Sequence, residues 1–174
     1  MQTAHAIGLS LYAYANDNQG LYPDGTSSTE VFQKLLDQGY VADRQIFYVP
    51  MEGKTRPVQD QKRLKPENVC WDVTSGASAK DTNRLPLVFL TGFRVTYAAG
   101  GGIAPLKPFP PYEHFSSDSG VAVFFTDNSV GWVTNDNPTV MFNGKSFSMG
   151  QLIESDFDAH GKTYRQLTPE GVLR

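Results

Sequence analysis

The chain has 174 residues, of which 40% are hydrophobic and 19% are charged. This length and composition are typical of one globular domain with a real core, and they exclude a disordered chain. The formal net charge is −3, from 15 basic and 18 acidic residues. That balance argues against nucleic acid as a partner, because a phosphate-binding surface normally carries an excess of Lys and Arg. The single cysteine, Cys70, excludes an intrachain disulfide, and its place between Val69 and Trp71 predicts a small core residue.

The first predicted element is a helix over residues 2–18. Its apolar residues recur at three- and four-residue intervals, which places them on one helical face. They are Ala4, Ile7, Leu11, Tyr14 and Ala15. Short polar side chains at positions 16–18 compete with the helical backbone, Gly20 can adopt the left-handed conformation, and Pro23 cannot extend the run. Nothing marks the start of the helix, so we expect these residues to be the second half of a longer helix.

A second, shorter helix is predicted over about Thr29–Gln38. Ser27, followed three residues later by Glu30, is a capping-box signature, and Gly39 closes the pattern. One helical face is apolar and consists of Val31, Phe32, Leu35 and Leu36. Residues Tyr40–Pro50 are predicted to be extended, and the polar residues 51–65 are predicted to be irregular. The basic residues between Lys54 and Lys65 indicate a solvated loop.

From Glu67 onward the pattern changes to short apolar runs with a period of two, which predicts strands. The predicted strands are Val69–Val73, Leu85–Leu90, Phe93–Ala98, Val121–Phe125 and Val130–Val133. Helices followed by strands indicate the α+β class with an antiparallel sheet. We therefore expect one domain over residues 1–174, with the sheet within about 67–134 and a C-terminal extension over 135–174.

Three connecting segments complete the prediction. Residues 126–129 contain Asp127 and Asn128, which tolerate positive φ and so favour a tight hairpin between the last two strands. The glycines at 100–102 and the prolines that follow them predict a surface insertion. Ser146–Ile153 is compatible with a short helix or a strand, and the tail from Asp156 is ambiguous.

Two segments resemble bacterial type IV pilin-like proteins, in particular the pseudopilins of general secretion pathway G type. The first resembles the run that follows the membrane-spanning part of those proteins, and its matching residues are Ile7, Gly8, Leu9, Leu11, Tyr14, Ala15, Asp17, Asn18, Gly20 and Pro23. The second, Val121–Val133, is similar to the closing hairpin of that family and includes Phe125, Asp127, Asn128 and Trp132. Together the two segments cover about a fifth of the chain.

The resemblance implies a pilin-like fold, with an N-terminal helix packed on an antiparallel sheet through Ile7, Leu11, Tyr14 and Ala15. It also implies a non-enzymatic subunit of a type II secretion or type IV pilus-like filament. Members of the family carry an N-terminal membrane helix behind a prepilin-peptidase cleavage site. We therefore expect an inner-membrane anchor outside this sequence and a periplasmic or extracellular globular domain. The implied partners are other pilin-like subunits and secretion or pilus assembly proteins.

Calcium is the one cofactor that the resemblance raises, since the G-type pseudopilins bind it in a C-terminal loop. Asp156 and Asp158, followed by Gly161, match the opening of a calcium loop. The far end does not match, because Leu167 occupies the position that requires a bidentate Glu. We expect no cofactor, with Asp156 and Asp158 as the only metal candidates. The histidines are His5, His114 and His160, and no pair has the spacing of two ligands on one helical face.

Two alternatives stay open. The first alternative is a carbohydrate- or protein-binding module of the cell envelope. The chain has more aromatic residues than one sheet face can hide, and exposed aromatic side chains can bind sugars or proteins. The aromatic residues concerned are Tyr12, Tyr14, Tyr22, Tyr40, Tyr48, Phe109, Tyr112 and Phe115. Tyr12 lies off the apolar face of the first helix, so it is available to a neighbouring subunit. A hydrolase is the less favoured alternative, since no Gly-x-Ser-x-Gly or His-Glu-x-x-His motif is present.

Overall fold

The structure is a computed structural model, which describes residues 1–81, 85–97, 103–105, 121–133, 139–142, 145–148 and 163–173. Only the backbone is described for 103–105, 139–142 and 145–148. The helices are α1 (Gln2–Asp17) and α2 (Ser28–Asp37), with the 3-10 helices η1 (Arg44–Phe47) and η2 (Pro66–Asn68). The strands are β1 (Trp71–Ser75), β2 (Pro86–Leu90), β3 (Phe93–Val95), β4 (Ile103–Pro105), β5 (Val121–Phe125), β6 (Val130–Val133), β7 (Thr139–Phe142), β8 (Lys145–Ser148) and β9 (Arg165–Leu167).

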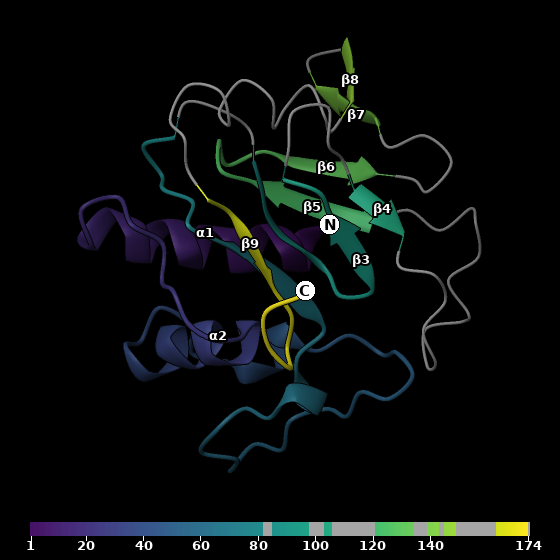
Figure 1. Cartoon of the computed structure of the whole chain (residues 1–174). Coiled ribbons are helices and arrows are strands. Elements are labelled where there is room, and N and C mark those ends of the chain that lie inside the picture. The colour runs from purple at the N-terminus through teal and green to yellow at the C-terminus, as the bar shows by residue number, and fades with distance from the viewer. Residues whose placement is uncertain are drawn as a thin grey trace.

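Five strands form the main sheet, in the order β6-β5-β2-β1-β9, and every neighbouring pair is antiparallel. The predicted α+β class, with an N-terminal helix and an antiparallel sheet, is confirmed (Figure 1). The prediction that the sheet lies within residues 67–134 is wrong, because β9 of the C-terminal segment pairs with β1, with Leu167 opposite Val73. A three-residue strand has too few positions for an alternating pattern, so its pairing partner defines it and its local sequence does not.

Several boundaries differ from the prediction. Strand β1 begins at Trp71 and not at Val69, because the amide of Cys70 donates to the carbonyl oxygen of Phe47 outside the sheet. Residues 44–47, predicted to be extended, form η1, where the Asp43 carboxylate accepts a hydrogen bond from the amide of Gln45. Asp43 therefore caps this 3-10 turn, a local interaction that the weak hydrophobic pattern of the segment did not reveal.

Smaller pairings account for the remaining strands. Strand β3 ends at Val95, earlier than predicted, and pairs with β4 inside the segment that was predicted to be an insertion without strands. Strands β7 and β8 form a separate antiparallel pair, so residues 146–148 of the ambiguous segment are extended. Residues 149–153 lie outside the described part of the chain.

Both helices end as their sequences predict. The side-chain amide of Asn18 donates to the carbonyl oxygen of Tyr14 (2.8 Å), and Gly20 has a φ of +88°. At the start of α2 the hydroxyl of Ser27 accepts a hydrogen bond from the amide of Glu30 (3.2 Å). The Glu30 carboxylate binds the amide of Thr26 rather than that of Ser27, so the reciprocal half of the capping box is displaced by one residue.

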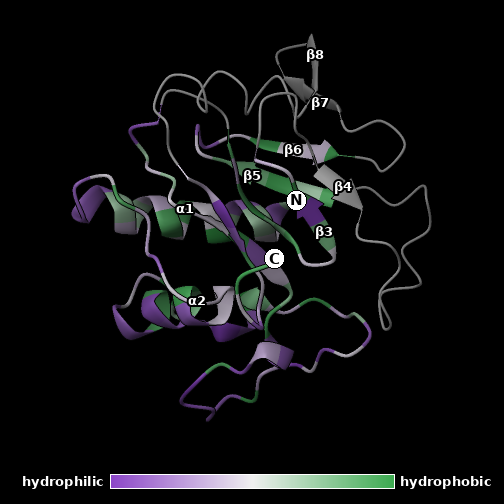
Figure 2. Ribbon diagram, in the orientation of Figure 1, coloured by the Kyte–Doolittle hydropathy of each residue, from purple (hydrophilic) through white to green (hydrophobic). Residues whose placement is uncertain are grey.

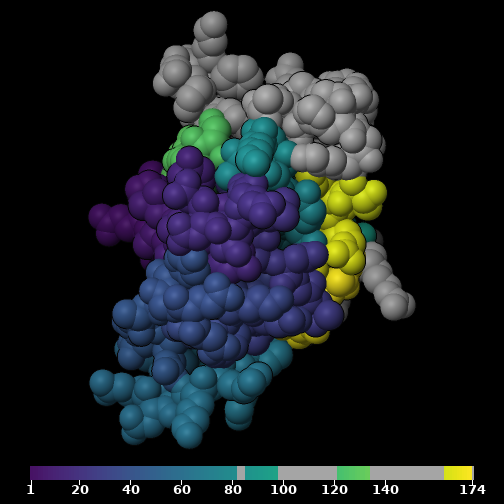
Figure 3. Space-filling model, turned by 90° about the vertical axis from the view of Figure 1, so that its left-hand side faces the viewer, coloured from purple at the N-terminus to yellow at the C-terminus, as the bar shows by residue number. Residues whose placement is uncertain are grey.

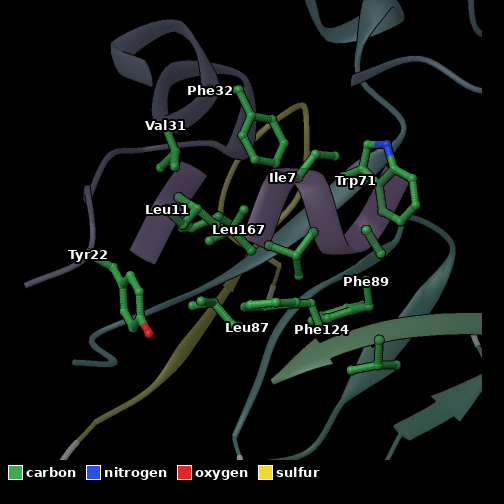
Figure 4. Close-up of a cluster of buried hydrophobic side chains, with 14 of the residues drawn as sticks. Ile7, Leu11, Tyr22, Val31, Phe32, Trp71, Leu87, Phe89, Phe124 and Leu167 are labelled. Atoms are coloured by element: carbon green, nitrogen blue, oxygen red, sulfur yellow. The ribbon is translucent and has the colours of Figure 1, made fainter. Parts of the chain in front are cut away.

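The helices cover one face of the main sheet. Helix α1 contacts β2 and β5, and α2 contacts β1 (Figure 1). In the core, Ile7 and Leu11 of α1 lie between Phe32 of α2 and Phe124 of β5 (Figure 4). Hydrophobic residues concentrate in β5, whereas the loop that follows η1 is mainly hydrophilic (Figure 2). The core is therefore a layer between two helices and a sheet.

The other face of the sheet contacts β3 near β1 and β9. Asp72, Thr74 and Gln166 point to this face, because Thr74 pairs with Gln166 and side chains alternate along a strand. The side chain of Gln166 accepts a hydrogen bond from the amide of Val95 (2.9 Å) and donates to the carbonyl oxygen of Phe93 (2.6 Å). Gln166 thus fixes β3 across the end of the sheet.

Candidate functional site

The inner face of α1 is the surface that the sequence predicted to dock on the sheet. Ile7, Leu11 and Ala15 are fully buried, while Tyr14 is half-buried and packs edge-on against the ring of Tyr40, with centroids 5.4 Å apart. Three of the four residues are therefore fully buried in the core, and Tyr14 packs against the edge of the core beside Tyr40.

Gly8, matched in the family motif but not chosen as a docking residue, makes the closest approach between α1 and the sheet. A Cβ atom at this position would lie 2.2 Å from the ring of Phe124. Only glycine lets the helix backbone lie directly on that ring. The sequence carries the signal as a glycine on the apolar face of an otherwise well-formed helix.

The outer face of α1 is exposed and follows the same helical spacing. We use this name for His5, Leu9, Tyr12 and Asn16. The exposed fraction is 45% for Leu9 and 38% for Tyr12. Tyr12 thus lies where the sequence analysis expected, away from the docking face. Two apolar side chains on an exposed helical stripe form a surface that a partner can cover.

A hollow lies where the outer face of α1 meets the loop that connects β1 to β2. It has a volume of about 260 Å³ and is lined by Tyr12, Asn16, Gln19, Gly20, Ala79 and Lys80. The amide of Ala79 donates to the carbonyl oxygen of Gly20 (2.8 Å), and the hydroxyl of Ser78 donates to the same oxygen (2.9 Å). These two bonds hold the loop against the end of the helix, and we call the concavity the α1-end hollow.

The β5–β6 hairpin contains the other residues chosen from the sequence. Phe125 is buried, and the Asp127 carboxylate accepts a hydrogen bond from the amide of Ser129 (3.0 Å). Asn128 has a φ of +65°, so the structure bears out the interpretation of this pair as turn residues. Trp132 lies opposite Ala122 and is 51% exposed. The hairpin therefore presents one large aromatic side chain to its surroundings.

Asp72 is a buried carboxyl group that the sequence analysis did not select. It is fully buried in β1, where one oxygen accepts a hydrogen bond from the side-chain amide of Gln166 (2.6 Å) and the other has no partner among the described residues. Burial raises the pKa of Asp72 to about 7, against the smaller opposing effects of hydrogen bonds from Gln166 and Thr91. The available signal was one acidic residue inside the apolar run Val69–Val73.

Cys70 is buried, as predicted for a core residue. Its thiol donates to the carbonyl oxygen of Val49 (3.3 Å) and accepts from the Val49 amide (3.4 Å). Burial raises the pKa of the Cys70 thiol, which disfavours the thiolate that a nucleophile requires. Tyr22, one of the aromatic residues considered for an exposed platform, is buried as well, so that expectation is wrong for this residue.

Both metal candidates, Asp156 and Asp158, lie outside the described residues. His114 and His160 lie outside them as well, and His5 is exposed on α1. Leu167, at the far end of the calcium-loop pattern, is fully buried in β9. Within the described ranges, no group of three or more His, Cys, Asp or Glu residues is arranged to hold a metal ion.

Comparison with known proteins yields no relative. No family model matches the chain, and neither the curated proteins nor the solved structures contain a match. In the part of the chain that the structure describes, neither helix has both the length and the apolar character needed to cross a bilayer.

Proposed function

We propose that this chain is the globular domain of a pilin-like subunit, non-enzymatic, that assembles into a type II secretion or type IV pilus-like filament. The observation that carries the proposal is the way α1 packs along β2 and β5 through its inner face. The resemblance to pilin-like proteins implies the same arrangement, an N-terminal helix packed on an antiparallel sheet.

The outer face of α1 supports the same proposal. Leu9 and Tyr12 are exposed along one stripe of a helix whose opposite side is fully buried. Filaments of identical subunits need head-to-tail contacts between two different surfaces of each copy. In this proposal the stripe supplies one of those surfaces, and the exposed Trp132 of the hairpin lies on another element available for contact.

The proposed location follows from the proposed anchor. The preceding half-helix would hold the subunit in the bacterial inner membrane, and the domain would lie in the periplasm or outside the cell. Its partners would be other pilin-like subunits and the proteins that assemble the secretion filament or pilus.

The first test is the complete gene. We expect the codons before Met1 to encode a short basic leader, a processing site and about 20 apolar residues. The full-length product is expected in the inner-membrane fraction, and in sheared filaments when it is overproduced. A gene that begins at Met1, or a full-length product found free in the periplasm, would refute the anchor and the filament with it.

The second test is cross-linking between copies in cells. Leu9→Cys places a thiol on the outer face of α1, while Val58→Cys places one in the loop after η1 at a residue that is 65% exposed. The native Cys70 is buried and does not interfere. We expect Leu9→Cys in the full-length protein to give cross-linked copies with a short bifunctional maleimide and Val58→Cys to give far fewer. Equal yields from the two variants would indicate random collisions and contradict a specific contact at α1.

A further inference from the structure

The α1-end hollow has features of a ligand site that assembly alone does not explain. Four residues with polar side chains line it, Tyr12, Asn16, Gln19 and Lys80, beside Gly20 and Ala79. Among the residues that the structure describes, none of these four polar side chains has a hydrogen-bond partner, although they lie around one concavity. The space-filling view shows the end of α1 directly against the segment that follows β1 (Figure 3).

The backbone at the edge of the hollow is strained. Gln19 has a φ of +60°, in the left-handed region, where a residue with a side chain other than Asn or Asp is uncommon. That conformation costs roughly 1–2 kcal/mol for an ordinary residue. Gly20, which follows it, also has a positive φ. Left-handed residues occur just past helix ends, and strained ones cluster at binding sites.

The chemistry of the four groups fits a sugar ring. An exposed aromatic ring offers a flat apolar face to the C–H groups of a pyranose. Side-chain amides donate and accept hydrogen bonds at once, which suits pairs of neighbouring hydroxyl groups, and an ammonium group donates to hydroxyl oxygens. The volume of about 260 Å³ lies just below the roughly 300–1,000 Å³ of drug-sized sites, which favours a single ring.

The surrounding charge favours a neutral ligand. The last turn of α1 contains no basic residue, so the carbonyl groups at its end keep their partial negative charge. The Asp81 carboxylate accepts a hydrogen bond from the amide of Ser78 in the loop that carries Lys80. Lys80, the one basic residue among those that line the hollow, does not make an anion site beside a negative helix end and a carboxylate.

From these observations we infer that the α1-end hollow binds a neutral oligosaccharide, with one pyranose ring stacked on Tyr12 and its hydroxyl groups bonded to Asn16, Gln19 and Lys80. Sugar binding needs only the described domain, but Tyr12 and Asn16 also belong to the outer face of α1, so a sugar and a neighbouring copy would compete for this end of the helix.

The experiment is a titration of the ¹⁵N-labelled chain with maltotriose, cellotriose, mannotriose and chitotriose. We expect one of these sugars to shift the amide resonances of Gly20, Ala79 and Lys80, with a dissociation constant of about 1 mM. Tyr12→Ala is expected to weaken binding by about tenfold or more, whereas Tyr12→Phe, which keeps the ring, should stay within about threefold. Leu9→Ala is the matched control on the same helix, outside the hollow, and should bind as the unaltered chain does.

Three outcomes would overturn the inference. The first is the absence of shifts around the hollow with all four sugars at concentrations of about 20 mM, well above the expected dissociation constant. The second is binding that survives Tyr12→Ala unchanged. The third is a set of shifts at these residues that depends on protein concentration and not on sugar, which would assign the hollow to a contact between copies.

Discussion

The substitution Gly8→Ala tests how closely α1 lies on the sheet. In an exposed helix interior, this change stabilises a protein by about 1 kcal/mol, because alanine has the higher helix propensity. At Gly8 the added methyl group would lie 2.2 Å from the ring of Phe124, whereas carbon atoms in contact are roughly 3.5 Å or more apart. The ring or the helix would have to move by more than about 1 Å to accommodate it.

The cost of that movement exceeds the gain in propensity. Overpacking a close-packed core by a methyl group typically costs about 1–3 kcal/mol, and the backbone of α1 and the ring of Phe124 are both held by buried neighbours. We therefore expect the free energy of unfolding to fall by up to about 2 kcal/mol after the propensity gain is subtracted. For a domain of this size the Tm would decrease by up to about 8 °C.

Thermal unfolding followed by circular dichroism, together with urea denaturation, would measure the effect. Ala13→Gly, at an exposed position of the same helix, is the control for propensity alone and should cost about 1 kcal/mol. Phe124→Val removes the ring, so Gly8→Ala in that background should cost less than it does alone, and the double-mutant cycle measures the coupling. A Gly8→Ala variant that is more stable than the unaltered chain would show that α1 does not contact β5 as described.

Three further predictions concern stability. Asp72 has a raised pKa of about 7, so the stability linked to its proton is fully present below about pH 4 and is lost as the pH rises through 7. In urea titrations, Asp72→Asn should lack this loss, which amounts to up to about 4 kcal/mol between pH 4 and pH 8. Parallel pH profiles of the two proteins would contradict the assignment. Gln19→Gly should raise the free energy of unfolding by about 1 kcal/mol, because glycine adopts a positive φ without strain. The same variant should bind sugar more weakly. A lower Tm would show that Gln19 is not strained. Ser27→Ala removes the cap of α2 and should cost about 1 kcal/mol, with Ser10→Ala in exposed α1 as a comparison expected to be neutral or stabilising.

Local patterns in the sequence predicted the helices and most of the sheet. Both ends of α2 and the end of α1 follow from side chains within a few residues, such as Ser27 and Asn18, whose hydrogen bonds are local. Strands β5 and β6 were also predicted with correct bounds, because four or five consecutive apolar residues beside a tight turn form a strong local signal.

The candidate sites were predicted less completely. Helical spacing alone separated the docking residues Ile7 and Leu11 from the exposed Tyr12. The sequence did not indicate that Lys80 would lie beside Tyr12 and Gln19, because 61 positions separate Gln19 from Lys80. Their proximity depends on hydrogen bonds between the loop after β1 and Gly20.

By itself, then, the sequence determined the amphipathic helices, the turn residues and the α+β class, because each depends on interactions between residues close in the chain. The tertiary structure alone decided the edge strand β9, the burial of Asp72 beside Gln166 and the hollow at the end of α1. These features arise when segments distant in sequence meet, and the free energy of such contacts depends on the whole core and not on any local pattern.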